Sequence, residues 1–181
     1  MNFCLWITGL PGSGKSAIAE QLHRLLSTSG IEHVILSLDR IREIVTPEPD
    51  YTDSERRIVY RSLAFTAQLL IEHSTKSVII DATGNRREYR DLARRLIPEF
   101  GEVYVACPIE VCKERESLRK KGSVQRDLYK KAARGALEGG LPGVTAPYEA
   151  PENAEIEVPS DILSPRESAG RIMSYITARW A

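Results

Sequence analysis

The sequence predicts an α/β fold, in which a mainly parallel sheet is covered by helices on both faces. Short apolar runs alternate along the chain with segments of helical periodicity, a pattern typical of parallel strands joined by crossover helices. Most of these runs are continuously apolar, as strands buried on both faces should be. The 181 residues suit a single domain, 1–181, with one sizeable core.

The elements can be placed in chain order. We expect strands at residues 3–8, 33–39, 77–83, 102–107 and 155–159. We expect helices near residues 15–28, 54–73, 87–97, 109–121 and 127–138, and a last helix after Ser164. In the first helix, apolar residues recur at Ile18, Leu22, Leu25 and Leu26, which lie on one helical face. Capping boxes open the helices that follow Thr52 and Ser164.

A phosphate-binding loop lies between the first strand and the first helix. Residues 9–16 match the pattern G-x-x-x-x-G-K-[ST] in the strand–loop–helix setting that the motif requires. The loop consists of Gly9, Leu10, Pro11, Gly12, Ser13, Gly14, Lys15 and Ser16. Its glycines allow successive backbone amides to form an anion nest at a helix N-terminus. Lys15 would reach the terminal phosphates and Ser16 would hold Mg²⁺. The alternative is an ordinary glycine-rich turn, but motif and flanking elements agree on ATP binding.

Two carboxylates follow neighbouring candidate strands. In open parallel sheets ligands bind beyond the carboxyl ends of the strands, and Asp39 and Asp81 each stand at such an end. Asp39 can orient Mg²⁺ or accept the proton of an attacking hydroxyl, and Asp81 resembles the carboxylate that holds Mg²⁺ through water. Each can alternatively be a helix cap. Arg42, three residues after Asp39, would share its helix face and could bind an acceptor phosphate, or simply pair with Asp39.

The segment from Lys113 to Arg134 is basic. It holds nine Lys or Arg and three acidic residues, in a chain whose totals are balanced at 25 basic and 25 acidic residues. We expect a basic flap, about residues 113–145, that closes over the triphosphate and neutralises charge on the transferred group. A solvated helical face is the alternative.

Composition limits the partners and the compartment. The formal net charge is zero, which argues against a nucleic-acid partner. No apolar stretch approaches the roughly 18 residues of a membrane span, so no membrane partner is expected. The three cysteines show no metal or disulfide spacing, which indicates a reducing, cytoplasmic location. The substrate should be a small anion, and a homodimer is left open.

The chain resembles the adenylylsulfate kinase family over nearly its whole length. The resemblance is most specific in three strings, at residues 108–115, 128–132 and 146–153, and the last, A-P-Y-E-A-P-E-N, is close to diagnostic. It implies a P-loop kinase with a five-stranded parallel sheet, ATP and Mg²⁺ as cofactors, and adenosine 5′-phosphosulfate as acceptor. It implies that Arg115 packs on the ATP adenine. Acceptor binding would fall to Arg42, Tyr51, Arg56, Arg87 and Lys131.

The sequence departs from the family on the acceptor side. Ser37 and Leu38 replace the first two residues of D-G-D, and Gly84 replaces the serine of F-I-S-P-F-R. Residues 139–143, G-G-L-P-G, replace K-G-F-T-G, so a lysine and an aromatic are missing. An aromatic stack on a base is worth about 1–3 kcal/mol. Three hypotheses remain: transfer to the 3′-hydroxyl of adenosine 5′-phosphosulfate, transfer to another nucleotide conjugate or a polynucleotide end, or a non-catalytic nucleotide switch. In the first two, Lys15 and Asp39 would be the catalytic residues.

Overall fold

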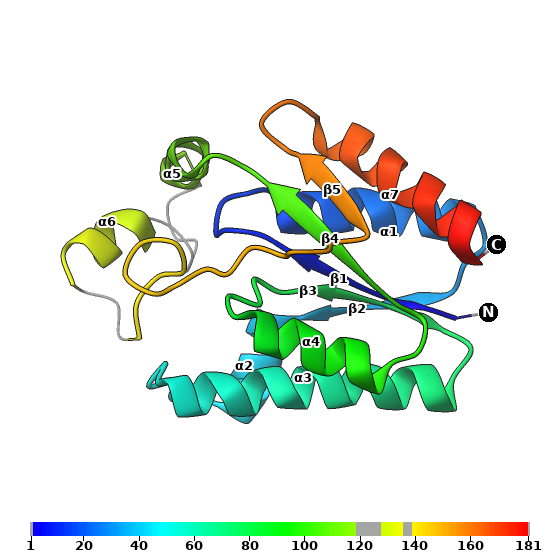
Figure 1. Ribbon diagram of the computed structural model, residues 1–181, viewed down its shortest axis with the longest axis horizontal. Helices are drawn as coiled ribbons and strands as arrows, with labels where there is room; N and C mark the ends of the chain where they lie inside the picture. The colour runs from blue at the N-terminus through cyan, green and yellow to red at the C-terminus, as the bar shows by residue number, and fades with distance from the viewer. Residues whose placement is uncertain (1, 119–127, 136–138, 181) are drawn as a thin grey trace.

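The computed structural model describes residues 2–118, 128–135 and 139–180 as one five-stranded sheet between two layers of helices (Figure 1). The strands are β1 (Cys4–Thr8), β2 (His33–Ser37), β3 (Ser77–Asp81), β4 (Phe100–Ala106) and β5 (Ile156–Pro159). The helices are α1 (Lys15–Thr28), α2 (Leu38–Val45), α3 (Asp53–His73), α4 (Arg87–Leu96), α5 (Ile109–Ser117), α6 (Leu128–Ala133) and α7 (Pro165–Trp180). The predicted α/β fold with a parallel sheet is confirmed.

The sheet has the order β2-β3-β1-β4-β5, and all of its paired strands are parallel. Strand β1 is central and completely buried, which explains its uninterrupted apolar sequence. Strand β2 is at an edge, and its side chains are only half-buried, with Ile35 37% exposed. Parallel strands need crossover connections, and the described helices α1 to α6 lie in the connections between consecutive strands.

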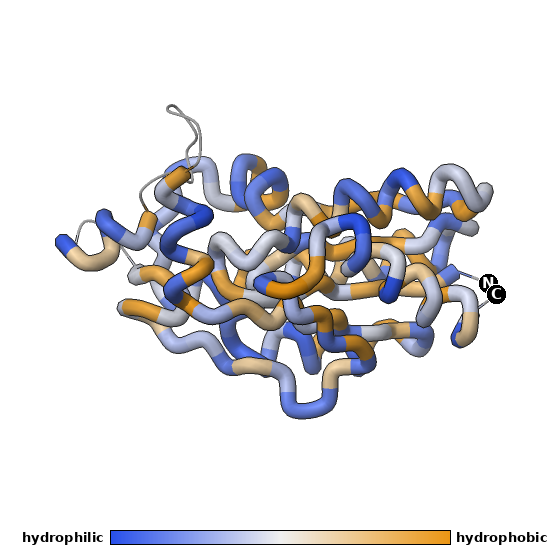
Figure 2. The backbone as a smooth tube through the Cα atoms, turned by 90° about the horizontal axis from the view of Figure 1, so that it is seen from above, coloured by the Kyte–Doolittle hydropathy of each residue, from blue (hydrophilic) through white to orange (hydrophobic). Residues whose placement is uncertain are grey.

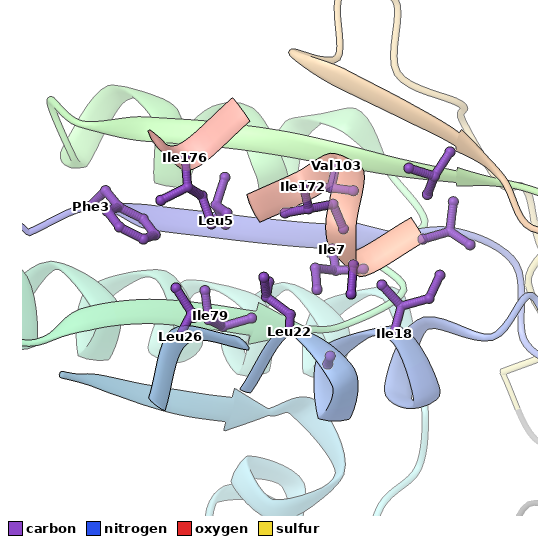
Figure 3. Packing of buried hydrophobic residues seen from close by; sticks show 14 of the residues in the cluster. Phe3, Leu5, Ile7, Ile18, Leu22, Leu26, Ile79, Val103, Ile172 and Ile176 are labelled. Atoms are coloured by element: carbon purple, nitrogen blue, oxygen red, sulfur yellow. The ribbon is translucent and has the colours of Figure 1, made fainter. Parts of the chain in front are cut away.

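Alternate residues of β1, and Phe3 just before it, face opposite layers of helices. Phe3, Leu5 and Ile7 pack on one side with side chains of α1 and α7, as Figure 3 shows. Cys4 and Trp6 pack on the other side against α3 and α4. Each fully buried aliphatic side chain contributes about 1.5–3 kcal/mol, and β1 supplies buried side chains to both cores. Seen from above, apolar residues run mainly along the strands in the middle of the molecule (Figure 2).

Several predicted element boundaries need correction. The third strand was expected to reach residue 83 but ends at Asp81, and the fourth was expected from residue 102 but begins at Phe100. The second strand was expected to reach residue 39, but it ends at Ser37, and α2 starts at Leu38. The apolar residues Leu38 and Ile41 pack against the α3 and α4 side of the core. A short helix can bury them there, so their apolar character does not require a strand. The helix expected at 127–138 is described only as α6, Leu128–Ala133. Among the described residues, no helix is both long and apolar enough to span a membrane.

Both predicted capping boxes lie at helix starts, and one of them is reciprocal. At α7, the backbone amide of Glu167 donates to Ser164 Oγ at 3.3 Å, and the backbone amide of Ser164 donates to Glu167 Oε2 at 2.8 Å. At α3, Glu55 donates its amide to Thr52 Oγ1 at 3.2 Å, but its carboxylate accepts from the amide of Asp50 at 2.6 Å. The carboxylate of Glu55 is turned toward the loop before the helix.

Candidate active site

The candidate site lies at the carboxyl edge of the sheet, where helices α5 and α6 and the segment before β5 gather (Figure 1). The loop 9–16 follows β1 directly. Asp81 ends β3 and is paired in register with Ile7 of β1 on one side and Ser37 of β2 on the other. Asp39 is two residues beyond Ser37, in the first turn of α2. The topology therefore brings the phosphate-binding loop and both predicted carboxylates to adjacent strand ends.

The loop 9–16 has the backbone that its sequence predicts. Gly12 has a φ of 80°, and a Cβ atom there would lie 2.5 Å from the carbonyl oxygen of Cys112, so only glycine fits. Ser13 donates its amide to Leu10 O at 3.1 Å, and its hydroxyl is buried with no hydrogen-bond partner. An unpartnered buried polar atom in a loop of this kind fits a site that a triphosphate completes.

Lys15 is the first residue of α1 and is 9% exposed. Its Nζ donates to the carbonyl oxygens of Gly9 at 2.9 Å and Leu10 at 2.8 Å. The ammonium group therefore lies over the loop, where a helix N-terminus adds positive potential. Lys15 and the loop amides together form a cationic cradle suited to phosphate oxygens.

Arg115 connects α5 to the phosphate-binding loop. Its Nη2 donates to the carbonyl of Ser160 at 2.6 Å, and its Nη1 lies 3.3 Å from Ser160 Oγ and 3.5 Å from the carbonyl of Ser13. Ser160 Oγ itself donates to Ser13 O at 2.7 Å. The predicted ATP-side residue Arg115 is thus beside the loop, held by a serine just after β5 that the sequence did not single out.

Tyr129 of α6 was also missed from sequence. Its hydroxyl donates to the carbonyl of Pro11 at 2.7 Å, and the side chain is 6% exposed. Burial raises the pKa of Tyr129 well above its usual range, so the phenol remains a neutral donor at physiological pH. Only its placement in the string 128–132 marked it in the sequence, because a lone tyrosine carries no chemical signature.

The residues predicted to hold Mg²⁺ supply the right donor atoms. Asp39 is exposed at the start of α2, Asp81 is half-buried at the end of β3, and Ser16 is exposed in the first turn of α1. Carboxylate and hydroxyl oxygens are the ligands that Mg²⁺ prefers. The chemistry of this set therefore fits Mg²⁺.

Two residues predicted to bind the acceptor, Arg42 and Tyr51, are neighbours. Arg42 pairs with Glu55 at 2.6 Å, and its guanidinium carbon lies 5.1 Å from the ring centroid of Tyr51. The side chains of Arg42 and Glu55 are 13% and 11% exposed, so this pair is well shielded from solvent. The structure gives Arg42 a carboxylate partner on α3 and an aromatic partner in the loop before it.

Arg56 joins α3 to the segment that follows α6. Its Nη2 donates to the carbonyl oxygens of Gly139 at 2.5 Å and Gly140 at 2.8 Å, while its buried Nε has no partner. The Arg56 guanidinium is therefore satisfied by backbone oxygens on one edge only. Lys131 is exposed on α6. The flap predicted at 113–145 includes residues 119–127 and 136–138, which lie outside the described residues.

Arg87 starts α4 and is held by the string 146–153. Its backbone amide donates to Glu149 Oε2 at 2.8 Å, and its guanidinium pairs with Glu149 and Glu152. Asn85 adds two hydrogen bonds between the same segments. Its side-chain Nδ2 donates to Pro147 O at 3.0 Å, and its backbone carbonyl accepts from the amide of Glu149 at 2.8 Å. The nearly diagnostic string is therefore the partner of the loop between β3 and α4.

Comparisons with known proteins agree with this geometry. Residues 1–159 match the family model described as adenylylsulphate kinase. The chain is 34% identical to an adenylyl-sulfate kinase of Thermodesulfovibrio yellowstonii over 177 residues, covering 97% of this chain and 84% of that protein. It is 33% identical to the adenylyl-sulfate kinase of Bacillus velezensis, covering 95% and 83%. The structure of an APS kinase from Mycobacterium tuberculosis with AMPPNP and APS superposes with a TM-score of 0.83, at 27% identity, covering 97% of this chain and 98% of that one.

Proposed function

The chain belongs to the adenylylsulphate kinase family, and from this premise we propose that it transfers the γ-phosphoryl group of ATP to the 3′-hydroxyl of adenosine 5′-phosphosulfate. It is a phosphotransferase with an alcohol group as acceptor. The observation that carries the proposal is the complete phosphate-binding loop, braced by Arg115 and Tyr129 beside the strand ends of Asp39 and Asp81. In-line transfer of a phosphoryl group needs positioning and charge neutralisation more than covalent chemistry.

Each residue of the ATP side has a separate task. The amides of residues 9–16 and the ammonium of Lys15 bind the β- and γ-phosphates and neutralise charge that develops during transfer. Arg115, which lies beside the loop carbonyl of Ser13, would pack on the adenine, as the family resemblance implies. Ser16, Asp39 and Asp81 would hold Mg²⁺. When bound, Mg²⁺ neutralises phosphate charge.

Asp39 and arginines of α2, α3 and α4 would act on the acceptor. Asp39 accepts the proton of the attacking hydroxyl or orients the metal shell. Arg42, Arg56 and Arg87 bind the anionic group, and Tyr51 stacks on the base. In the structure Arg42 and Arg56 already have oxygen partners in Glu55 and in the carbonyls of 139 and 140. An anionic acceptor would therefore bind by exchanging with these oxygens, with Lys131 approaching from α6.

A different acceptor is the second candidate function. The observation that favours it is the segment 139–143, where Gly139 and Leu141 stand in place of the family's lysine and aromatic and where the backbone itself contacts Arg56. Another nucleotide conjugate would then use the same ATP side. A polynucleotide end is disfavoured by the neutral charge of the chain, and a steep salt dependence of binding would reveal it.

The test is ADP release with Mg-ATP and adenosine 5′-phosphosulfate, followed by the mass of the product. A 3′-phosphorylated product, absent with Lys15→Ala, would support the proposal. Release of ADP only with another nucleotide conjugate would favour the second candidate. Nucleotide-dependent binding of a protein partner without turnover would indicate a switch. Undiminished transfer by folded Lys15→Ala would refute the kinase assignment. A homodimer and a cytoplasmic location stay predictions, and sedimentation equilibrium tests the first.

A further inference from the structure

Arg90 of α4 is a buried cation that no motif identified. It is 1% exposed and is among the largest fully buried side chains of the described residues. Its Nε donates to Glu102 Oε1 at 2.5 Å, its Nη1 to the carbonyl of Gly84, and its Nη2 to the carbonyl of Glu149 at 2.7 Å. A buried charge is costly unless it is paired and fully hydrogen-bonded, and all three edges of this guanidinium are used.

The two carbonyl oxygens belong to two different segments of the acceptor side. Gly84 lies in the loop between Asp81 and Arg87, and Glu149 lies in the segment that leads to β5. These segments are 65 residues apart in sequence and are otherwise joined through Asn85 and the Glu149 carboxylate. Because the guanidinium is planar and rigid, one side chain fixes the distance between both backbones.

We call Arg90 and its contacts with the Gly84 and Glu149 carbonyls the Arg90 clamp. Glu102 connects this clamp to the sheet. It is 5% exposed on β4, which pairs with β1, the strand that leads into the phosphate-binding loop. Arg94, one turn after Arg90, lies 3.5 Å from Glu102 and pairs with Glu155. Burial raises the pKa of Glu102, against the opposing effect of Arg90 and Arg94. Through Glu102 and β4, the two segments that Arg90 holds are connected to β1 and so to the loop 9–16.

We propose that Arg90 is a positioning residue that sets the acceptor side of the site relative to the ATP side. It does not touch the reacting atoms. It holds the Gly84 and Glu149 backbones, and thereby the place of Arg87. The predicted effect on KM rests on the proposed function. The positioning of the two backbones by Arg90 rests on the contacts alone. The acceptor KM should therefore depend on Arg90, while the KM for ATP should not.

The test compares Arg90→Lys with Arg94→Lys. Lysine keeps the charge but cannot donate along three edges of a plane. Arg94 shares the helix and the Glu102 partner but contacts neither loop carbonyl, so its variant is the matched control. We expect Arg90→Lys to raise the acceptor KM about tenfold, equivalent to about 1.4 kcal/mol, with the ATP KM and the kcat within about twofold. Arg94→Lys should leave all three unchanged.

Equal effects of the two variants, or equal rises in both KM values, would overturn the inference, since a purely structural role would affect both substrates. If Arg90→Lys does not fold, Glu102→Gln carries the test, because loss of the ion pair weakens the connection between Arg90 and β4. The acceptor KM should then rise while the ATP KM stays unchanged, and an unchanged acceptor KM would overturn the inference. Amide hydrogen exchange of residues 148–150 provides a readout that needs no activity. Faster exchange there in Arg90→Lys than in Arg94→Lys supports the clamp even if adenosine 5′-phosphosulfate proves not to be the acceptor; unchanged exchange refutes it.

Discussion

Gly84 offers a sharp test of how tightly the loop after β3 is packed. Its φ is +54°, and a Cβ atom built there would lie 3.0 Å from Cζ2 of Trp6 and 3.0 Å from both Cγ and Cδ of Arg90. Neither neighbour can move away easily, because the Trp6 indole donates to Ala82 O at 2.9 Å and Arg90 is held on three edges. The perturbation is Gly84→Ser, which restores the family's serine.

The expected loss of stability has two parts. A non-glycine residue in the left-handed region costs about 1–2 kcal/mol. Forcing an extra side chain into a well-packed core costs about 1–3 kcal/mol more. The variant Gly84→Ser should therefore unfold about 2–5 kcal/mol more easily, a large part of the stability of an ordinary domain.

Gly30 supplies the matched control. Its φ is +71°, but nothing lies within 4 Å of a Cβ atom built there. The variant Gly30→Ser should show only the backbone cost of about 1–2 kcal/mol. Urea unfolding followed by circular dichroism measures both, with the slope m compared to ensure that the transitions are equivalent. Equal destabilisation by the two substitutions would refute the packing argument, and a neutral Gly84→Ser would refute the backbone argument as well.

Three further predictions follow from single contacts. Arg115→Ala should raise the KM for ATP about fivefold, as expected for loss of about 1 kcal/mol of cation–π contact; an unchanged KM would separate Arg115 from the nucleotide. Tyr129→Phe removes the donor to Pro11 O and should lower the free energy of unfolding by about 1 kcal/mol, measured by urea titration; no change would contradict a stabilising role for this bond. Hydrogen bonds from the Ser164 hydroxyl and amide hold the pKa of Glu167 below its usual 4.5. The contribution of the ionised Glu167 carboxylate to the free energy of unfolding is therefore complete above about pH 4.5. It is lost as the pH falls through the lower pKa of the folded state. Ser164→Ala should reduce this acid-side loss in melting experiments, and identical pH profiles would contradict the capping argument.

The local elements of the fold could be predicted because they depend on short-range rules. The alternation of apolar runs and periodic segments identified five strands and most helices, and the loop 9–16 was recognisable because its glycines and Lys15 sit at fixed spacing. The shared helix face of Asp39 and Arg42 anticipated α2, but its start at Leu38 was not predicted, because the apolar residues around Leu38 fit either a strand end or a helix turned toward the core. Boundaries of one or two residues depend on caps and packing that the pattern does not encode.

The fold class and the phosphate-binding loop can be read from the sequence, since the motif and its flanking elements are contiguous in the chain. The pattern also marks the strand ends near which Asp39 and Asp81 stand. The partners of the buried arginines cannot be read in this way: Arg56 binds the carbonyls of 139 and 140, and Arg90 binds Glu102 across α4 and β4. A buried guanidinium must satisfy its donors wherever oxygens converge. Which oxygens converge is set by strand order and register, and neither can be read from the residues next to the arginine.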